Sequence, residues 1–186
     1  MALDMKEMIA EAAKKLVMEK KSKKLTVKDI VEECHISRQA SYYHFADIPE
    51  LIEWMINKEA KYAAEEMKSQ TDAEQALRQF FLIAIRSKPS IQRGMQSIYR
   101  EELEKILKQA FFRLFEQAVE TNHLYPGYTH PEIKIILRYH TQAVMGLLWE
   151  WTDADSKNID QIVHIVYLMM LGKISPLDTF DKKVEV

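Results

Sequence analysis

The chain has 186 residues, a formal net charge of −2 and a single cysteine, Cys34. One cysteine excludes an internal disulfide framework, the small net charge does not by itself indicate a nucleic-acid binder, and no apolar run approaches the roughly 18 residues of a membrane span. Only 4 glycines and 5 prolines interrupt the sequence, which favours long helices. We therefore expect a soluble, cytoplasmic, all-α protein with no membrane partner.

Residues 25–45 carry the pattern of two short helices joined by a tight turn. Thr26 is placed to N-cap the first helix, and Ser37 is placed to N-cap the second, which spans residues 38–44. Such a pair, with polar side chains on the second helix, is typical of a helix-turn-helix. An amphipathic helix predicted over residues 4–20 packs across the pair and completes a three-helix domain.

This stretch resembles the N-terminal domain of TetR/AcrR-type transcriptional regulators. The matching residues are T-V-x-D-I, I-S-R, Y-Y-H-F and E-L, and Y-x-H-F is the most specific among them. Beyond residue 55 only length and helical pattern fit the family. The resemblance implies a three-helix DNA-binding domain followed by a helical domain for ligand binding and dimerisation. We expect these domains at residues 1–47 and 48–176, with a tail at 177–186.

The N-terminal side chains of the second helix are candidates for base recognition. Arg38 can donate two hydrogen bonds to guanine, and Gln39 can bridge the edge of adenine. Ser41 and Tyr43 are further candidates for contacts with bases. Core packing competes with DNA contact for the aromatic residues Tyr42, Tyr43 and Phe45, and we prefer it for Phe45.

The resemblance also implies contacts with the sugar-phosphate backbone, which fix the register on DNA without reading its sequence. The residues at the corresponding positions are Thr26, Ser37, Tyr42 and His44. Each subunit of a dimer is then expected to bind one half-site of a roughly palindromic operator.

Two positions depart from the family pattern. The turn at residues 34–36 lacks the usual glycine, so His35 is expected to adopt the left-handed conformation at a modest cost. At the start of the next helix, Ile48 stands where the family commonly has a phosphate-contacting lysine, and we expect it to be exposed. The alternative function is therefore a co-regulator whose degenerate helix-turn-helix uses Ile48 and Tyr42 for protein–protein contacts.

Four lysines precede the helix-turn-helix, at positions 20, 21, 23 and 24. They are either a phosphate-facing edge or a solvated helix end whose charges interact with the C-terminal dipole. Asp47 is expected to cap the helix that follows the helix-turn-helix, with Pro49 in its first turn.

Apolar periodicity predicts long helices in the rest of the chain. A connecting helix is expected from residue 48 to about 69. The helix that follows it is expected to end before Lys88-Pro89. The further helices are expected at residues 73–87, 90–99, 101–122, 131–153 and 159–174, with a loop at 123–131.

These helices hold more aromatic and thioether side chains than a dimer seam needs. Helical domains of this size can enclose an apolar pocket, and the resemblance implies that it binds a small-molecule inducer. The candidate pocket residues are Phe81, Tyr99, Phe111, Phe115, His140, Met145 and Trp149. Ordinary core packing is the alternative for each of them.

The helix predicted at 159–174 is apolar around nearly its whole circumference, so it has to be buried on all sides. A second chain is the simplest cover, with the helix at 131–153 completing a four-helix bundle in a homodimer. The candidate interface residues are Gly146, Trp151, Ile162, Ile165, Val166 and Met169. A central core helix of a monomer is the alternative.

The sequence shows no catalytic or metal-binding motif and no Gly-rich phosphate loop. Cys34 is expected to pack inside the helix-turn-helix. We therefore predict a non-enzymatic, cofactor-free transcriptional regulator, a repressor that a small molecule releases from DNA.

Overall fold

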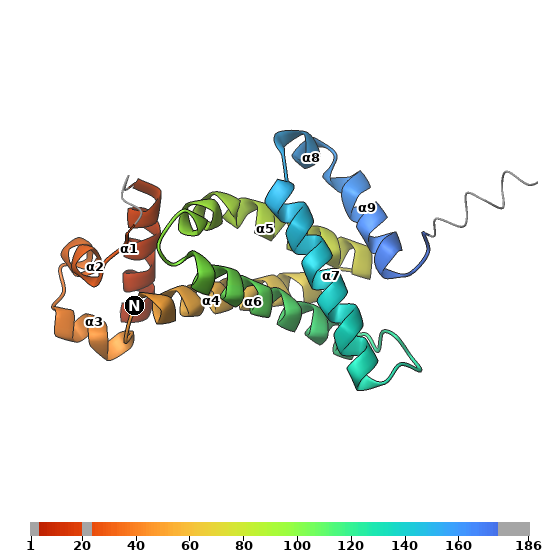
Figure 1. Ribbon diagram of the computed structural model, residues 1–186, viewed down its shortest axis with the longest axis horizontal. Helices are drawn as coiled ribbons and strands as arrows, with labels where there is room; N and C mark the ends of the chain where they lie inside the picture. Colours follow the sequence, from red (N-terminus) through yellow and green to blue (C-terminus); the bar gives the residue numbers. More distant parts are fainter. Residues whose placement is uncertain (1–3, 20–23, 175–186) are drawn as a thin grey trace, which may run out of the picture. The chain divides into compact units, whose positions relative to one another are not determined.

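The computed structural model describes residues 4–19 and 24–174, and within these ranges it consists of helices without strands (Figure 1). The all-α prediction is thus confirmed. The helices are α1 (Met5–Glu19), α2 (Val27–Cys34), α3 (Arg38–His44), α4 (Ile48–Lys68), α5 (Ala73–Met95), α6 (Arg100–Thr121), α7 (His130–Glu150), α8 (Asp153–Lys157) and α9 (Ile159–Met170).

Three of the four clustered lysines, at positions 20, 21 and 23, lie outside the described residues, as does the tail expected at 177–186. Among the helices described, none combines the length and the apolar character that crossing a lipid bilayer demands.

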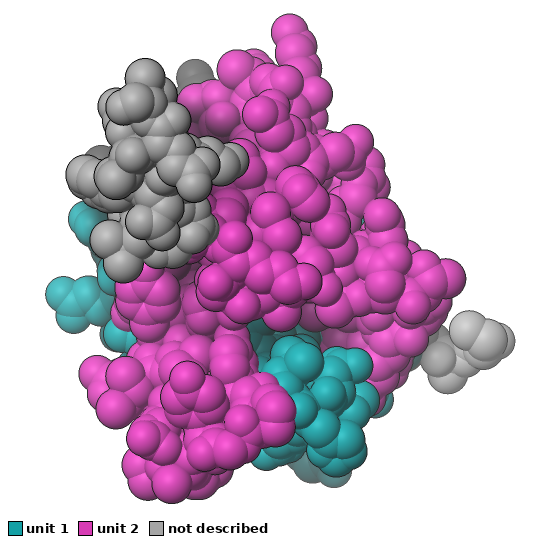
Figure 2. Space-filling view, turned by 90° about the vertical axis from the view of Figure 1, so that its right-hand side faces the viewer, with its two compact units in different colours: residues 1–62, 86–124 teal, residues 63–85, 125–186 magenta. Residues whose placement is uncertain are grey.

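The chain divides into two compact units, which Figure 2 colours separately. The first unit comprises Met1–Tyr62 and Arg86–Leu124, and the second comprises Ala63–Ile85 and Tyr125–Val186. Two of the three boundaries fall inside helices, so α4 and α5 each contribute to both units, and the third lies in the loop between α6 and α7. The functional division after residue 47 stays a prediction.

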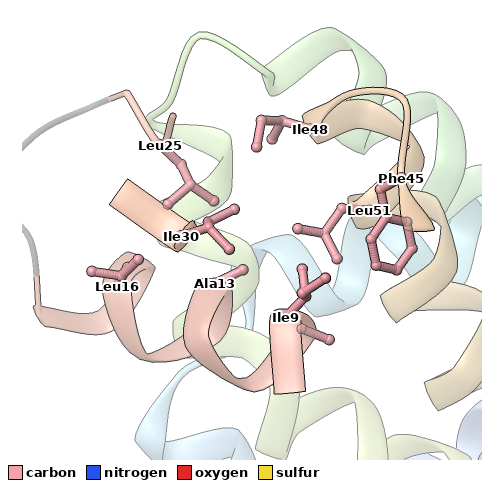
Figure 3. Packing of buried hydrophobic residues seen from close by; sticks show 9 residues of the cluster. Ile9, Ala13, Leu16, Leu25, Ile30, Phe45, Ile48 and Leu51 are labelled. Atoms are coloured by element: carbon pink, nitrogen blue, oxygen red, sulfur yellow. The ribbon is translucent and has the colours of Figure 1, made fainter. Parts of the chain in front are cut away.

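The core of the first unit lies where α1 packs against α2 and α3, next to the start of α4. Ile9, Ile30 and Leu51 point toward one another there, and none is more than 2% exposed (Figure 3). Burying one such side chain contributes about 1.5–3 kcal/mol. Ile48 belongs to the same buried cluster and is only 5% exposed. The expectation of an exposed Ile48 is therefore wrong.

The expected helix break at Lys88-Pro89 is also wrong, because α5 continues through Pro89 to Met95. A proline inside a helix costs about 3 kcal/mol, so packing on both sides of it must compensate. Before the proline, Phe80 and Phe81 are buried in the second unit. After it, Arg93 donates to backbone carbonyl groups at the end of α1 within the first unit.

The last helices end earlier than predicted, and capping explains both cases. α7 stops at Glu150 because Thr152 begins α8, accepting a hydrogen bond from the Asp155 amide at 3.2 Å. α9 stops at Met170 because Gly172 adopts a left-handed conformation, with φ 64°. A glycine at this position closes a helix without the steric penalty that a Cβ would bring.

Candidate nucleic-acid interface

α2 begins with a reciprocal cap, which confirms the prediction for Thr26. The Thr26 hydroxyl accepts from the Asp29 amide at 3.2 Å, and it donates to the Asp29 carboxylate at 2.8 Å. That carboxylate also accepts from the Thr26 amide at 3.0 Å. Because the hydroxyl proton is donated to Asp29, this geometry gives Thr26 a role in starting α2 and leaves no proton for a phosphate.

The turn between α2 and α3 is made without glycine. His35 has φ 54° and ψ 40°, the left-handed conformation that the sequence predicted for it. Its amide donates to carbonyl groups at the end of α2, and the Ile36 amide donates to the Val31 carbonyl at 3.1 Å. A left-handed residue other than glycine costs about 1–2 kcal/mol, so the turn keeps its geometry at that cost.

α3 presents one exposed polar face, formed by Arg38, Gln39, Tyr42 and Tyr43. Arg38 and Tyr42 are four residues apart, as are Gln39 and Tyr43, so each pair shares a side of the helix and the two pairs lie next to each other. Tyr42 is 54% exposed and Tyr43 is 86% exposed, which excludes core packing for both. Such a face on a short helix is what base recognition in the major groove requires.

The ends of α3 hold two further predicted contacts. The Ser37 hydroxyl accepts from the Ala40 amide at 3.1 Å, which confirms the N-cap and leaves the hydroxyl proton to be donated outward. His44 is half-buried at the other end, and its ring lies edge-on to Tyr43 with centroids 5.2 Å apart.

Two residues of this segment face the core. Phe45 is 5% exposed and its extended backbone ends α3, as preferred from the sequence. Ser41 is also 5% exposed, so its predicted base contact is wrong. Ser41 is two residues away from both Gln39 and Tyr43, so it lies on the opposite side of the helix from them. Its polar side chain made it look like a base contact in the sequence.

The N-terminus of α4 is closed by acidic side chains. The Asp47 carboxylate accepts from the Glu50 amide at 2.8 Å, which confirms the predicted cap. The Glu50 carboxylate reaches back to the Ala46 amide at 2.6 Å. Two carboxylates therefore lie beside the position where the family commonly has a lysine that contacts phosphate.

Cys34 lies at the end of α2 and is half-buried. Its thiol contacts the Met8 carbonyl oxygen at 3.6 Å. Burial, followed by the nearby charge of Glu33, raises the pKa of the Cys34 thiol. The sulfur therefore stays protonated and packs between α1 and α2.

A family model described as bacterial regulatory proteins, tetR family, matches residues 9–55. Residues 9–55 belong to the tetR family. The matched range runs from α1 through the TetR-family helix-turn-helix and ends inside α4. Regulators of this family bind DNA operators and small-molecule ligands and are generally dimeric. A comparison with curated proteins gives no match.

Solved structures show the same fold over most of the chain. The dihydroxyacetone kinase operon activator DhaS is 18% identical, with 91% of this chain and 95% of that chain covered and a TM-score of 0.58. A TetR transcriptional regulator from Rhodococcus sp. RHA1 is 16% identical, with 91% and 96% covered and a TM-score of 0.58. The fatty acid degradation regulator FadR from Bacillus halodurans is 15% identical, with 91% and 99% covered and a TM-score of 0.54.

The residues predicted to line a ligand pocket are not brought together in either unit of this TetR-family fold. Tyr99, Phe111 and Phe115 lie in the first unit, whereas Phe81, His140, Met145 and Trp149 lie in the second. The first unit contains a pocket of about 550 Å³, and of the predicted residues only Tyr99 lines it.

Several of the other predicted pocket residues have local partners instead. Phe81 is 0% exposed and its ring centroid lies 5.4 Å from that of Trp151, so it is a core residue of the second unit. His140 contacts the Tyr125 hydroxyl at 3.3 Å, and that hydroxyl donates to the Met170 carbonyl at 3.1 Å. Burial lowers the pKa of His140 and raises that of Tyr125.

Two predicted interface residues are wrong, because their own chain covers them. Trp151 is 7% exposed and donates from Nε1 to the Ser156 hydroxyl at 2.9 Å. Val166 is 8% exposed. Ile165 and Met169, by contrast, are 42% and 53% exposed, consistent with an interface on α9.

The two other interface candidates lie between these extremes. Gly146 is exposed on α7 with nothing within 4 Å of the place where a Cβ would be, and Ile162 is half-buried. In residues 4–19 and 24–174 no group of three or more His, Cys, Asp or Glu side chains is arranged to hold a metal ion.

Proposed function

We propose that this chain is a dimeric, ligand-responsive transcriptional repressor that binds a roughly palindromic operator through α3. The exposed face of Arg38, Gln39, Tyr42 and Tyr43 is the observation that carries the proposal. Hydrogen bonds at the starts of α2 and α3 and the left-handed turn hold this face rigidly. Such preorganisation lowers the cost of ordering the backbone when a short helix enters the major groove.

The α3 side chains divide into base readers and backbone contacts. Arg38 is suited to guanine O6 and N7, and Gln39 to adenine N6 and N7. Tyr43 is 86% exposed and is suited to thymine methyl groups, while Ser37, Tyr42 and His44 would hold the sugar-phosphate backbone. Thr26 and Ser41 drop out of this set.

Exposed apolar side chains on the second unit support a homodimer. Ile135 and Tyr139 on α7 are 65% and 66% exposed, and Leu147 on the same helix is 42% exposed. Together with Ile165 and Met169 on α9 they form apolar surface that a second copy would cover. The proposed division of labour puts DNA binding in residues 1–47 and ligand binding and dimerisation in residues 48–176. A ligand that prefers the non-binding conformation would then release DNA by differential affinity.

The first test is salt-dependent binding to DNA from the protein's own promoter region. Arg38→Ala should weaken binding by about 1–3 kcal/mol and relax the preference at one base pair. Arg113→Ala is the matched control, because Arg113 is also an exposed arginine, on α6. An Arg38→Ala protein with the affinity and base preference of the control would refute the assignment of α3.

The sign of regulation needs a separate measurement, since one structure with the same fold is named an operon activator. Deleting the gene should raise expression from a reporter carrying its promoter if the protein is a repressor. A fall in expression would make it an activator, with α3 still the reader.

The acidic cap of α4 favours one other function, that of a co-regulator acting through protein–protein contacts. Asp47 and Glu50 place negative charge where a phosphate would otherwise approach. The buried Ile48 no longer contributes to this alternative, so exposed Tyr42 and Tyr43 would be its contact surface. Selection of random DNA by the isolated dimer separates the two: enrichment of a palindrome supports the repressor, and no enrichment supports the co-regulator.

A further inference from the structure

The pocket of the first unit lies between helices far apart in sequence. α1, α4, the end of α5 and the start of α6 all line it, and its volume is about 550 Å³. Its walls are mainly apolar, with two methionines, Met18 and Met55, among branched aliphatic side chains. At roughly 30 Å³ per heavy atom, the share of a water molecule in the liquid, this volume holds about 18 heavy atoms. Binding sites for small molecules commonly have this size and character.

The pocket shares a wall with the core of the helix-turn-helix. Leu16, Leu25 and Leu51 line the pocket and belong to the buried cluster shown in Figure 3. The same cluster includes Ile30 of α2 and Phe45 at the end of α3. A molecule in the pocket would therefore press on side chains that set the position of α3.

Polar contacts at the edge of the pocket tie the α5–α6 segment to both sides of the α1–α2 connection. Arg93 donates to the Met18 carbonyl, and to that of Val17 at 3.4 Å, at the end of α1. Tyr99 donates from its hydroxyl to the Leu25 carbonyl at 3.1 Å, just before α2. Burial, followed by the charges of Asp47 and Glu102, raises the pKa of Tyr99, which keeps this donor protonated.

The charged residues that line the pocket are mostly cations. Lys14, Lys24 and Arg93 carry positive charge, and Glu19 carries negative charge. An apolar cavity with a cationic edge is complementary to a molecule that has an apolar chain and an anionic end. A cationic or strongly polar molecule would meet unfavourable charge or leave the apolar walls unfilled.

We propose that this pocket binds a single-chain amphiphile with an anionic end, and that binding there alters the hold of α5 and α6 on the helix-turn-helix. The inference rests on the proposed function only for its effect on DNA; the binding itself is independent of it. Ten-carbon molecules are suitable probes, because decanoate has 12 heavy atoms and fits within the roughly 18 that the volume allows.

Isothermal titration of the full chain with three probes that share a ten-carbon chain tests the class of ligand. Decanoate should bind at least about tenfold more tightly than decyltrimethylammonium, with decan-1-ol between them, because the net positive charge of the edge attracts the anion and repels the cation. Equal binding of the anionic and cationic probes, or no binding of decanoate, would overturn the proposal.

Substitutions then locate the site. Ile91→Trp fills the pocket from α5 and should weaken decanoate binding about tenfold or more, with unchanged far-UV circular dichroism. Ile56→Phe fills it from α4 and gives a second variant should the first fail to fold. Decanoate binding that both folded variants retain would place the ligand elsewhere.

A charge reversal at the edge gives a matched pair. Lys14→Glu should weaken decanoate binding about fivefold and strengthen that of decyltrimethylammonium, as expected for reversing one partly screened charge. Lys105→Glu makes the same change on an exposed residue of α6 outside the pocket lining and should alter neither. Equal effects of the two reversals would refute a cationic edge.

Operator binding with and without decanoate separates the two proposals. Decanoate that binds and lowers operator affinity in the native protein, but not in Ile91→Trp, supports both. Operator binding without decanoate binding overturns this inference alone. Decanoate binding by a protein that selects no DNA leaves the site in place and overturns the proposed function.

Discussion

Replacing Ile48 by alanine tests whether this position belongs to the core or to a surface. The side chain is 5% exposed and clusters with Leu25, Phe45 and Leu51 (Figure 3). Alanine removes three carbon atoms, which at about 0.8 kcal/mol per buried methylene gives about 2.4 kcal/mol of lost transfer free energy. The cavity left behind adds to this, so the free energy of unfolding should fall by about 2.5–4 kcal/mol.

The measurement is urea unfolding followed by circular dichroism at one fixed protein concentration, since a dimer makes stability depend on concentration. Ile98→Ala is the matched control, because Ile98 lies in the same unit but is 60% exposed. The control should change the free energy of unfolding by no more than about 0.5 kcal/mol. An Ile48→Ala protein as stable as the control would return Ile48 to the surface and revive its role in partner binding.

Three further substitutions test single features by urea unfolding. Thr141→Val should stabilise the protein by about 1 kcal/mol, because the buried Thr141 hydroxyl finds no hydrogen-bond partner among the described residues; a loss of stability would reveal a hidden partner. His35→Gly should stabilise by about 1 kcal/mol by relieving the left-handed turn, and no gain would refute the strain. Burial lowers the pKa of His140 from 6.5, so the unfolded chain takes up the proton first and stability should fall as pH drops below that value; His140→Gln should flatten this slope, and an unchanged slope would contradict it.

The parts of the fold that the sequence predicts best are those governed by local capping. Thr26, Ser37 and Asp47 are all N-caps in the structure, because each requires only a side-chain oxygen three residues before a free amide. The left-handed His35 follows from the short turn between two such helices.

The predictions that fail depend on packing between distant segments. Pro89 is a local helix breaker, but it lies inside α5 in the structure. The parts of α5 before and after it are fixed by packing and hydrogen bonds to residues distant in the sequence. Trp151 and Val166 have the composition of an interface and are buried by their own chain. Periodicity reports that a side chain is apolar, and it does not report which surface covers it.

The pocket shows the same limit for the site. Its lining joins α1 and α4 to residues 90–103, and no motif in the sequence links these segments. A tyrosine directly before a helix, such as Tyr99, is compatible with a core position, a ligand contact or a hydrogen bond to a loop. Only the structure shows that its hydroxyl reaches the Leu25 carbonyl.

The acidic cap of α4 shapes how the proposed DNA binding has to work. A helix N-terminus normally attracts phosphate through free amides, but here the Asp47 and Glu50 carboxylates occupy the Glu50 and Ala46 amides. These charges also repel a phosphate that approaches α4. Between α3 and the start of α4, contacts with the DNA backbone would therefore come from α3, through the Ser37 hydroxyl and the polar ends of Tyr42 and His44. A reader with few phosphate contacts would have a shallow salt dependence, and its affinity would rest on the bases that Arg38 and Gln39 are proposed to recognise.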